Sequence, residues 1–343
     1  MLNLARLAML RELQRTGTMT AAAESLHYTH SAISQQLAQL ERETGYTLFE
    51  KVGRRVELTE QGAILADYAV QMLALSEEAE AALAGSHRQV RGVLRVASFQ
   101  TMVATVVPQA LNMLQERHPD LTVEITQDEG ARATEKLFSK QFDVVLDEDY
   151  PGVSLPLRPG VHRENIFEDP MRLVTPATGP WSEVESLEEL SDAAWVLDPA
   201  DGAPGIWARA MCRQAGFEPK VQFESVDALL FKHLVREGHA VAFLPDLLLV
   251  DEVGTAGGGH AGGSQSGGYD ARGATMRVLS LPNNPIRSLY TTVLEGRQHH
   301  PAIKAFRAAI FEAAHGAAQE VSHSAAPEAD AGLGPVSGAQ AKR

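Results

Sequence analysis

The chain has 343 residues, of which 44% are hydrophobic and 22% are charged, as is typical of a soluble globular protein. Its longest apolar runs, such as 240–244, reach about five residues, whereas a membrane-spanning helix needs about 20, so a transmembrane span is excluded. The single cysteine, Cys212, excludes a disulfide framework and a multi-cysteine zinc site. Charged residues interrupt the segment 1–15, which argues against a secretory signal peptide and predicts a cytoplasmic protein.

The net charge of −14 is unevenly distributed along the chain. Residues 1–62 carry seven basic and seven acidic side chains and are neutral, so the acidity lies in the remaining residues. This distribution excludes a general polyanion binder. A few well-placed cations can still give selective binding to phosphates.

The first 58 residues predict short helices that end in a turn. Leucines recur at helical spacing over residues 4–13, and Thr18 or Thr20 can cap a helix through the alanines at 21–23. A further helix is expected to begin near His30 or Ser31 and to end at Gly45, a typical C-cap.

The pattern over residues 18–62 predicts a helix-turn-helix followed by a wing. The alanines allow two helices to approach closely, residues 27–29 form the turn, and the second helix leaves hydroxyl and amide side chains exposed near its start. Glutamine can bind adenine in a bidentate way, and an arginine at a hairpin tip can enter a minor groove. A generic three-helix subdomain with a solvated polar face is the alternative. The predicted DNA contacts are Thr29, His30, Ser31, Ser34, Gln35 and Gln36 on the helix, and Arg54 and Arg55 at the tight turn after Gly53.

Residues 59–88 predict one long helix after Thr59, a candidate N-cap. A helix of nearly 30 residues is about 43 Å long at 1.5 Å per residue, which exceeds what a small domain uses internally. A helix of this kind between two domains typically binds a partner by coiled-coil-like packing. Its apolar stripe, at spacings of three and four, consists of Ile64, Tyr68, Met72, Leu75, Ala79 and Leu83.

Residues 92–318 alternate strand and helix signals, which predicts a parallel α/β sheet. Eight glycines fall within residues 254–268, where no strand and no Lys-Ser/Thr pair makes a phosphate loop, so a flexible insertion is predicted. The Ala/Ser/Gly/Pro-rich segment 319–343 predicts a disordered tail. The predicted strands are 92–98, 121–126, 143–147, 171–176, 194–199, 221–225 and 240–245.

The N-terminal stretch strongly resembles the LysR-type transcriptional regulators. The matching residues keep their spacing over 20–24, 31–34, 40–41, 48–50, 53–55 and 58–62, with Leu26 and Gly45 between them, and residues 92–98, 107–125 and 234–245 are similar to the family's effector domain. The resemblance implies an α/β protein with an all-α winged helix-turn-helix, a linker and dimerisation helix, and a two-lobed α/β effector domain of the periplasmic binding protein type 2 kind. The implied ranges are 1–58, 59–88 and 92–318, with lobe one at about 92–165 and 270–318 and lobe two at about 166–250.

The resemblance further implies a sequence-specific DNA-binding regulator, not an enzyme, whose promoter binding is modulated by a small-molecule effector. Its implied partners are double-stranded promoter DNA, the effector, RNA polymerase and further copies of the chain in a homodimer or homotetramer; no cofactor, metal or membrane is expected. Where recognition helices of the family often carry Arg or Lys, this chain has Gln35, Ala38 and Gln39. The expected phosphate contacts therefore shift to Arg42, Lys51, Arg54 and Arg55.

Two other classes of protein compete with this interpretation. A solute-binding protein without DNA function is disfavoured by the first 60 residues and by the lack of a signal peptide. An enzyme is disfavoured because the sequence has no nucleophile elbow, Walker loop, metal-ligand spacing or dinucleotide glycine fingerprint.

In the implied effector domain, polar residues come directly after several predicted strands. Open parallel sheets bind ligands at this edge, outside the carboxyl ends of their strands. Residues 98–101 open a helix, where free N–H groups and the helix dipole favour an anionic group. In similar regulators this turn contacts the effector, often a small carboxylate or aromatic acid. Three aspartates among the candidates favour a cationic or amino-acid ligand instead, so the charge of the ligand stays open. The predicted effector contacts are Ser98, Phe99, Gln100, Thr101, Gln127, Asp128, Asp198, Asp201, Ser225 and Phe243.

Overall fold

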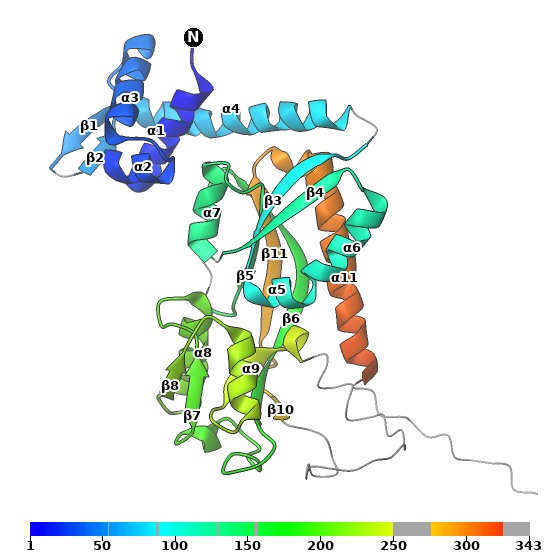
Figure 1. The fold of residues 1–343 in the computed structure, drawn as a ribbon. Helices are drawn as coiled ribbons and strands as arrows, with labels where there is room; N and C mark the ends of the chain where they lie inside the picture. The colour runs from blue at the N-terminus through cyan, green and yellow to red at the C-terminus, as the bar shows by residue number, and fades with distance from the viewer. Residues whose placement is uncertain (54, 87–88, 129, 154–156, 250–275, 325–343) are drawn as a thin grey trace, which may run out of the picture.

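The computed structural model describes residues 1–53, 55–86, 89–128, 130–153, 157–249 and 276–324 (Figure 1). A helical N-terminal domain, a long helix and a two-lobed α/β region follow one another along the chain, which confirms the predicted fold class. The glycine-rich insertion 254–268 and the wing residue Arg54 lie outside the described residues. Helix α11 (Pro301–Ser324) includes residues 319–324, which the composition had predicted to be disordered.

The N-terminal domain begins and ends its helices where the capping residues predict. The hydroxyl of Thr18 accepts a hydrogen bond from the N–H of Ala21 at 3.1 Å, and that of Thr29 accepts one from Ala32 at 3.2 Å. Gly45 adopts a φ of +74°, the left-handed conformation that ends a helix. The elements are α1 (Leu4–Thr16), α2 (Met19–Ser25), α3 (His30–Thr44), β1 (Phe49–Val52) and β2 (Arg55–Leu58).

Helix α4 (Glu60–Gly85) is the predicted long helix, capped by the side chain of Thr59, and its 26 residues span about 39 Å. Its small residues Ala66 and Ala69 are fully buried in the core that α4 shares with α1 and α3. The predicted apolar stripe lies mainly on the other side of the helix and faces solvent in a single copy of the chain. Its side chains Ile64, Tyr68, Leu75 and Leu83 are 52–71% exposed.

Lobe one is a sheet covered by helices on both faces. Strand β3 pairs in parallel with β4 and β5, as predicted, but β5 also pairs antiparallel with β11, so the sheet is mixed rather than parallel. Helix α11 buries Ile303, Phe306 and Ile310 against the sheet and α6. The elements are β3 (Gly92–Ser98), α5 (Gln100–Thr105), α6 (Val107–Arg117), β4 (Leu121–Gln127), α7 (Gly130–Phe138), β5 (Val144–Asp149) and β11 (Ile286–Leu294).

Strand β6 (Val161–Pro176) joins the two lobes because it is long enough to take part in both. It pairs antiparallel with β11 and, further along, with β9 (Ala242–Pro245) and β10 (Met276–Ser280), whereas the sequence had predicted only a short parallel strand at 171–176. It also runs across the predicted boundary between the lobes at 165–166. Lobe two is completed by β7 (Ala194–Leu197), α8 (Ala203–Gln214), β8 (Lys220–Glu224) and α9 (Ala228–Arg236), with β7 parallel to β8.

The long helix α4 lies across the end of lobe one (Figure 1). Glu77 of α4 is 7% exposed and forms ion pairs with Lys140 at 2.7 Å and with Arg297 at 3.7 Å. At Gly296, with φ +94°, an added Cβ would lie 2.2 Å from the carbonyl oxygen of Ala74, so only glycine permits this approach. The linker helix is therefore fixed to lobe one by both charge and shape.

Candidate DNA and effector sites

The first half of α3 presents the polar side chains that the sequence predicted for DNA contact. Ser31 and Gln35 are exposed, and Ser34 is half-buried beside the buried Ile33. Gln36 is held within the domain, because its side-chain oxygen accepts a hydrogen bond from Nε of Arg6 at 2.9 Å. Thr29 and His30 are exposed at the start of the helix, where Thr29 also acts as the cap.

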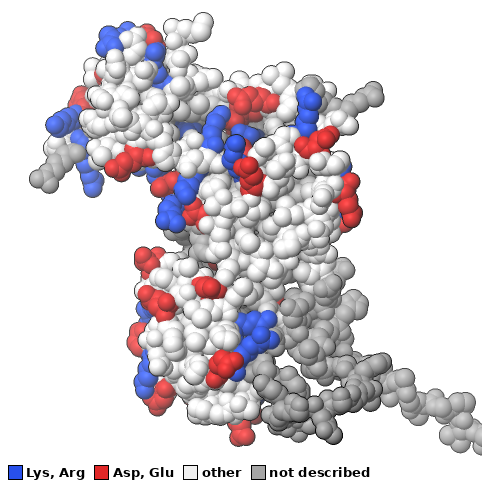
Figure 2. Space-filling view, viewed as in Figure 1, with Lys and Arg blue, Asp and Glu red and all other residues white. Residues whose placement is uncertain are grey.

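The β1–β2 hairpin forms the predicted wing beside this helix. Val52 pairs with Arg55 in the hairpin, and Gly53, directly after β1, has a φ of +64° in the left-handed region. Lys51 and Arg55 are exposed on the hairpin, and Figure 2 shows Lys and Arg side chains at this end of the molecule. Arg54, also predicted to contact DNA, lies outside the described residues.

Basic residues on α3 itself are few. Arg42 lies near its C-terminal end and donates hydrogen bonds to the side-chain oxygen of Gln39 at 3.1 and 2.7 Å. Glu43 pairs with Arg6 of α1 at 2.5 Å, and this hydrogen bond holds the pKa of the Glu43 carboxyl below its usual value. The uncharged first half of α3 therefore depends on the hairpin and α1 for nearby positive charge.

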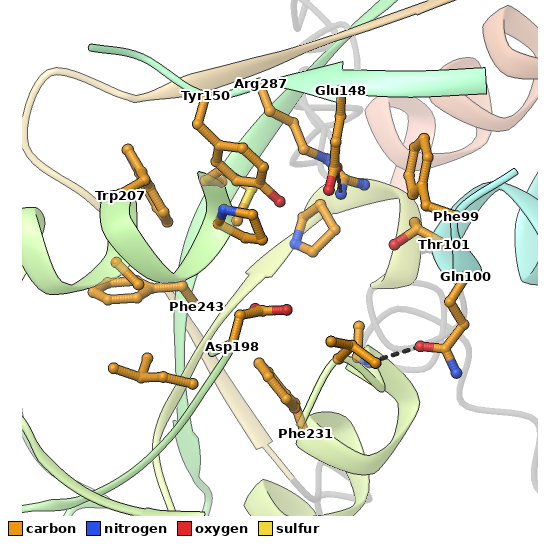
Figure 3. A pocket seen from close by; sticks show the side chains of 17 residues that line it. Phe99, Gln100, Thr101, Glu148, Tyr150, Asp198, Trp207, Phe231, Phe243 and Arg287 are labelled. Carbon is orange, nitrogen blue, oxygen red and sulfur yellow. Dashed lines mark hydrogen bonds and ion pairs between the residues drawn. The ribbon is translucent and has the colours of Figure 1, made fainter. Parts of the chain in front are cut away.

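An inner cavity lies between the lobes where the sequence predicted the effector site (Figure 3). It is small, with a volume of about 60 Å³. Helix α5 and the end of β5 line it from lobe one, and α8, α9 and β9 line it from lobe two. The predicted contacts that line it are Phe99, Gln100, Thr101, Asp198 and Phe243.

Gln100 connects the two lobes directly. Its side-chain nitrogen donates to the carboxylate of Asp227 at 2.6 Å, and its side-chain oxygen accepts from the N–H of Ala228 at 2.7 Å. This hydrogen bond lowers the pKa of Asp227, which also caps α9. The residue predicted to bind the effector therefore makes an interlobe clasp.

A buried ion-pair cluster forms one wall of the inner cavity. Arg287 is 2% exposed and lies 2.6 Å from both Asp169 and Glu148. Burial opposes the charge on Arg287, but the two carboxylates outweigh it and raise the pKa of the guanidinium. Tyr150 and Trp207 continue the lining, with ring centroids 5.5 Å apart.

A larger outer cavity adjoins the inner one and shares Phe99, Glu148 and Asp198 with it. Its lining includes the predicted residue Asp201 and, from the end of β5, Asp147, whose pKa burial raises to about 7. The two cavities form one cleft between the lobes, with an acidic wall along β5.

Four predicted effector residues line neither cavity. Ser98 is fully buried, and Gln127 is exposed at the end of β4. The carboxylate of Asp128 pairs with Arg132 at 3.2 Å and with Lys136. The hydroxyl of Ser225 accepts a hydrogen bond from the Asp227 N–H at 3.1 Å, which shapes the turn before α9. These positions support the cleft rather than line it.

Several cleft residues escaped the sequence-based prediction. The strand predicted at 143–147 is followed by two carboxylates and Tyr150, and the rule that ligands gather at carboxyl ends of strands could have singled them out. Arg287 had no such signal, because it lies on an antiparallel strand that the sequence did not predict. Trp207 lines the cleft from α8, which includes Pro204 and Gly205 in its first turn.

Other features of the described residues are structural. Cys212 is buried in lobe two, where burial raises the pKa of its thiol to about 12. Among the described residues, no group of three or more His, Cys, Asp or Glu side chains is placed to hold a metal ion. Within the same residues, no helix combines the length and the apolarity that crossing a bilayer requires.

Comparison with known proteins agrees with this architecture. Among solved structures, a full-length OxyR variant from Pseudomonas aeruginosa is similar with a TM-score of 0.55 and 20% identity, and the match covers 90% of this chain and 95% of that chain. An OxyR mutant from Corynebacterium glutamicum gives a TM-score of 0.51 and 18% identity, with 94% and 95% covered. These likenesses show a shared fold.

Sequence comparison identifies the family. The chain is 26% identical over 259 residues to a "Probable RuBisCO transcriptional regulator" from Trichormus variabilis, covering 72% of this chain and 74% of that protein. It is 28% identical over 232 residues to the HTH-type transcriptional regulator ClcR from Pseudomonas putida, covering 67% and 78%. Residues 4–63 match the bacterial regulatory helix-turn-helix proteins of the lysR family, and residues 87–260 match the LysR substrate binding domain. The chain therefore belongs to the LysR-type transcriptional regulators, a family of DNA-binding proteins that are not enzymes.

Proposed function

We propose that this regulator reads a promoter sequence with α3 and the β1–β2 hairpin, and that a small molecule bound in the interlobe cleft changes how it binds. The observation that supports this most directly is the exposed polar start of α3 beside a hairpin that carries Lys51 and Arg55. Amide and hydroxyl groups on such a helix can contact base edges, while cations on the hairpin contact phosphates.

The coupling between the two sites would run through lobe one. A ligand in the cleft touches both lobes, and the Gln100 clasp to α9 makes their separation a two-state element. Because Glu77 and Gly296 fix α4 to lobe one, a change in lobe one would turn the linker helix. The effector would thereby alter the spacing or bend of the bound promoter, its occupancy or its contact with RNA polymerase.

DNA binding through the hairpin can be tested by salt dependence. We expect the Lys51→Ala/Arg55→Ala variant to bind DNA from upstream of its own coding region at least about tenfold more weakly. The plot of log K against log salt should lose about one unit of slope for each phosphate contact removed. Gel shifts over a salt series measure both quantities.

The matched control for this variant is Lys220→Ala, because Lys220 is exposed in lobe two and pairs with Asp192. Its affinity and salt slope should equal those of the unmodified protein. If the hairpin variant also retains both values with its fold intact, the hairpin has no role in DNA binding.

We also propose that α4 pairs with the same helix of a second copy, in a homodimer or homotetramer. Leu75 and Leu83 are 65% and 71% exposed in one copy, so such pairing would remove them from water. Two helices joined in this way would space two hairpins for a pseudo-palindromic site.

Replacing both leucines with glutamate, as Leu75→Glu/Leu83→Glu, is expected to weaken self-association by about a hundredfold or more. Sedimentation velocity over a concentration series should then show monomer where the unmodified chain is oligomeric. Val278→Glu, on the lobe-two strand β10, serves as control and should leave self-association unchanged. Equal association of the α4 variant and the unmodified chain would assign the interface elsewhere.

A further inference from the structure

The charge of the cleft is unbalanced toward carboxylates. Among the described residues that line its two cavities there are five carboxylates but three guanidinium groups, and none of these described residues is Lys or His. The carboxylates are Asp147, Glu148, Asp149, Asp198 and Asp201, and the guanidinium groups are those of Arg158, Arg163 and Arg287.

Each of the three arginines already has a carboxylate partner. Arg287 pairs with Glu148 and also with Asp169, which is fully buried behind it. Arg163 lies 2.6 Å from Asp149, and Arg158 lies 3.5 Å from Glu135, which lies outside both linings. Each cation among the described lining residues is therefore already paired with a carboxylate, and only Nη1 of Arg158 and Nε of Arg163 are buried there without a hydrogen-bond partner.

Two carboxylates of the cleft have no ion pair within the described residues. The carboxylate of Asp147 accepts a hydrogen bond from the N–H of Glu148 at 2.9 Å, and Asp201 lies on the exposed rim at the start of α8. A carboxylate that loses water to burial is stabilised by a nearby positive charge. The vacant space beside these side chains suits a cationic group.

The remaining lining is aromatic. In Figure 3, Asp198 projects into the inner cavity, with Tyr150 on one side, Phe231 on the other, and Trp207 and Phe243 beyond them. Aromatic faces attract ammonium and guanidinium groups through their quadrupoles. The cleft already uses this chemistry, since the guanidinium of Arg163 lies 3.6 Å from the ring centroid of Tyr290.

From these observations we infer that the effector is an organic cation, a protonated or quaternary amine with an apolar body, and this inference rests on the proposed role of the cleft as effector site. The ammonium group lies toward the β5 carboxylates, and the apolar body packs against the aromatic side chains. A carboxylate ligand would have to leave water for a cavity of net negative charge. The side-chain nitrogen and oxygen of Gln100 are already hydrogen-bonded at the start of α9, so they would not be free to bind this carboxylate.

Binding should strengthen as the pH rises through 7. Burial raises the pKa of Asp147 to about 7, and a bound cation favours its ionised form. The groups around Asp147 are Glu148 and Asp149 on its own strand, Arg163 on β6 and Tyr290 on β11. Burial raises the pKa of Tyr290 further above this range, so Tyr290 does not reverse the trend.

Matched probes of opposite charge test this inference on the full chain. Phenethylammonium, benzyltrimethylammonium and 3-phenylpropionate share an aromatic body, and their binding at pH 8 and low salt is followed by calorimetry and thermal shift. We expect saturable binding of at least one cation in the millimolar range or tighter, and none of 3-phenylpropionate. Asp147→Asn/Asp201→Asn should weaken cation binding about fivefold or more, because each replacement removes a charge near the ligand.

The control variant is Asp192→Asn, whose carboxylate is exposed in lobe two, is not among the described lining residues and pairs with Lys220. It should bind the cations as the unmodified chain does. Tighter binding of 3-phenylpropionate than of the cations, or no binding of either cation, overturns the inference. Gel shifts on the same preparation test DNA binding separately. If DNA binding is intact, the proposed regulator function is retained even when no cation binds. If 3-phenylpropionate binds instead, the cleft is still an effector site, but with the opposite charge preference.

Discussion

Replacing Arg287 with methionine is expected to lower the free energy of unfolding by about 3–5 kcal/mol. The replacement leaves Asp169, which is fully buried, and Glu148, which is largely buried, without their shared cation. A buried carboxylate that loses its partner keeps its desolvation penalty, which is why removal of one partner costs more than the pair contributes. Urea denaturation at pH 7.5 and fixed protein concentration measures the change.

Two further variants isolate the cause. Arg287→Met/Asp169→Asn should recover part of the loss, because an amide carries no charge and its oxygen can still accept the N–H of Leu247. Arg95→Met serves as the surface control, since Arg95 and Glu124 are both more than half exposed at 3.5 Å, and such a pair contributes less than about 1 kcal/mol. If Arg287→Met costs no more than Arg95→Met, the buried cluster does not stabilise the fold.

Replacing Asp147 with asparagine is expected to change how stability depends on pH. The folded-state pKa of this carboxyl is raised to about 7, against 3.8 as its usual value, so the folded state binds more protons than the unfolded state between these values. The stability that Asp147 contributes is therefore present below about pH 4 and is lost as the pH rises to about 7. Asparagine does not titrate, so the variant does not lose this stability. The free energy of unfolding of Asp147→Asn, relative to that of the unmodified chain, should therefore rise by up to about 4 kcal/mol between pH 4 and pH 8.

The measurement is urea denaturation of both proteins across this pH range. The quantity to compare is the difference in free energy of unfolding between the two proteins at each pH. Burial also raises the pKa values of Glu148 and Asp169, and these groups contribute to the pH profile of each protein. Asp192→Asn is the control: pairing with Lys220 lowers the pKa of Asp192, so its effect on stability should be constant above pH 4. Parallel profiles for Asp147→Asn and the unmodified chain would show that Asp147 ionises normally.

The sequence predicted the N-terminal domain closely because its structure is specified by local interactions. A cap such as Thr18 and its partner Ala21 are three residues apart, and the apolar faces of the helices repeat at a fixed spacing. The strands at 92–98 and 121–126 were found for the same reason, since each is a short run of residues suited to a strand. Here the pattern in a few adjacent residues was sufficient.

The sequence also predicted the apolar stripe on α4 and the polar start of α3. Both are defined by which residues share a helix face, and that face follows from helical periodicity alone. Their roles in oligomer formation and DNA contact stay predictions, as do the individual site residues and the domain boundaries.

The sequence by itself determined the helices of the N-terminal domain, the long linker helix and the family of this protein, because each depends on residues close together along the chain. Only the tertiary structure decided the mixed sheet, the clasp from Gln100 to Asp227 and the pairing of Arg287 with Asp169. Those partners lie 127 and 118 residues apart, and local propensity does not encode such separations. The charge of the cleft likewise emerges only when β5, β6 and β11 bring their side chains together.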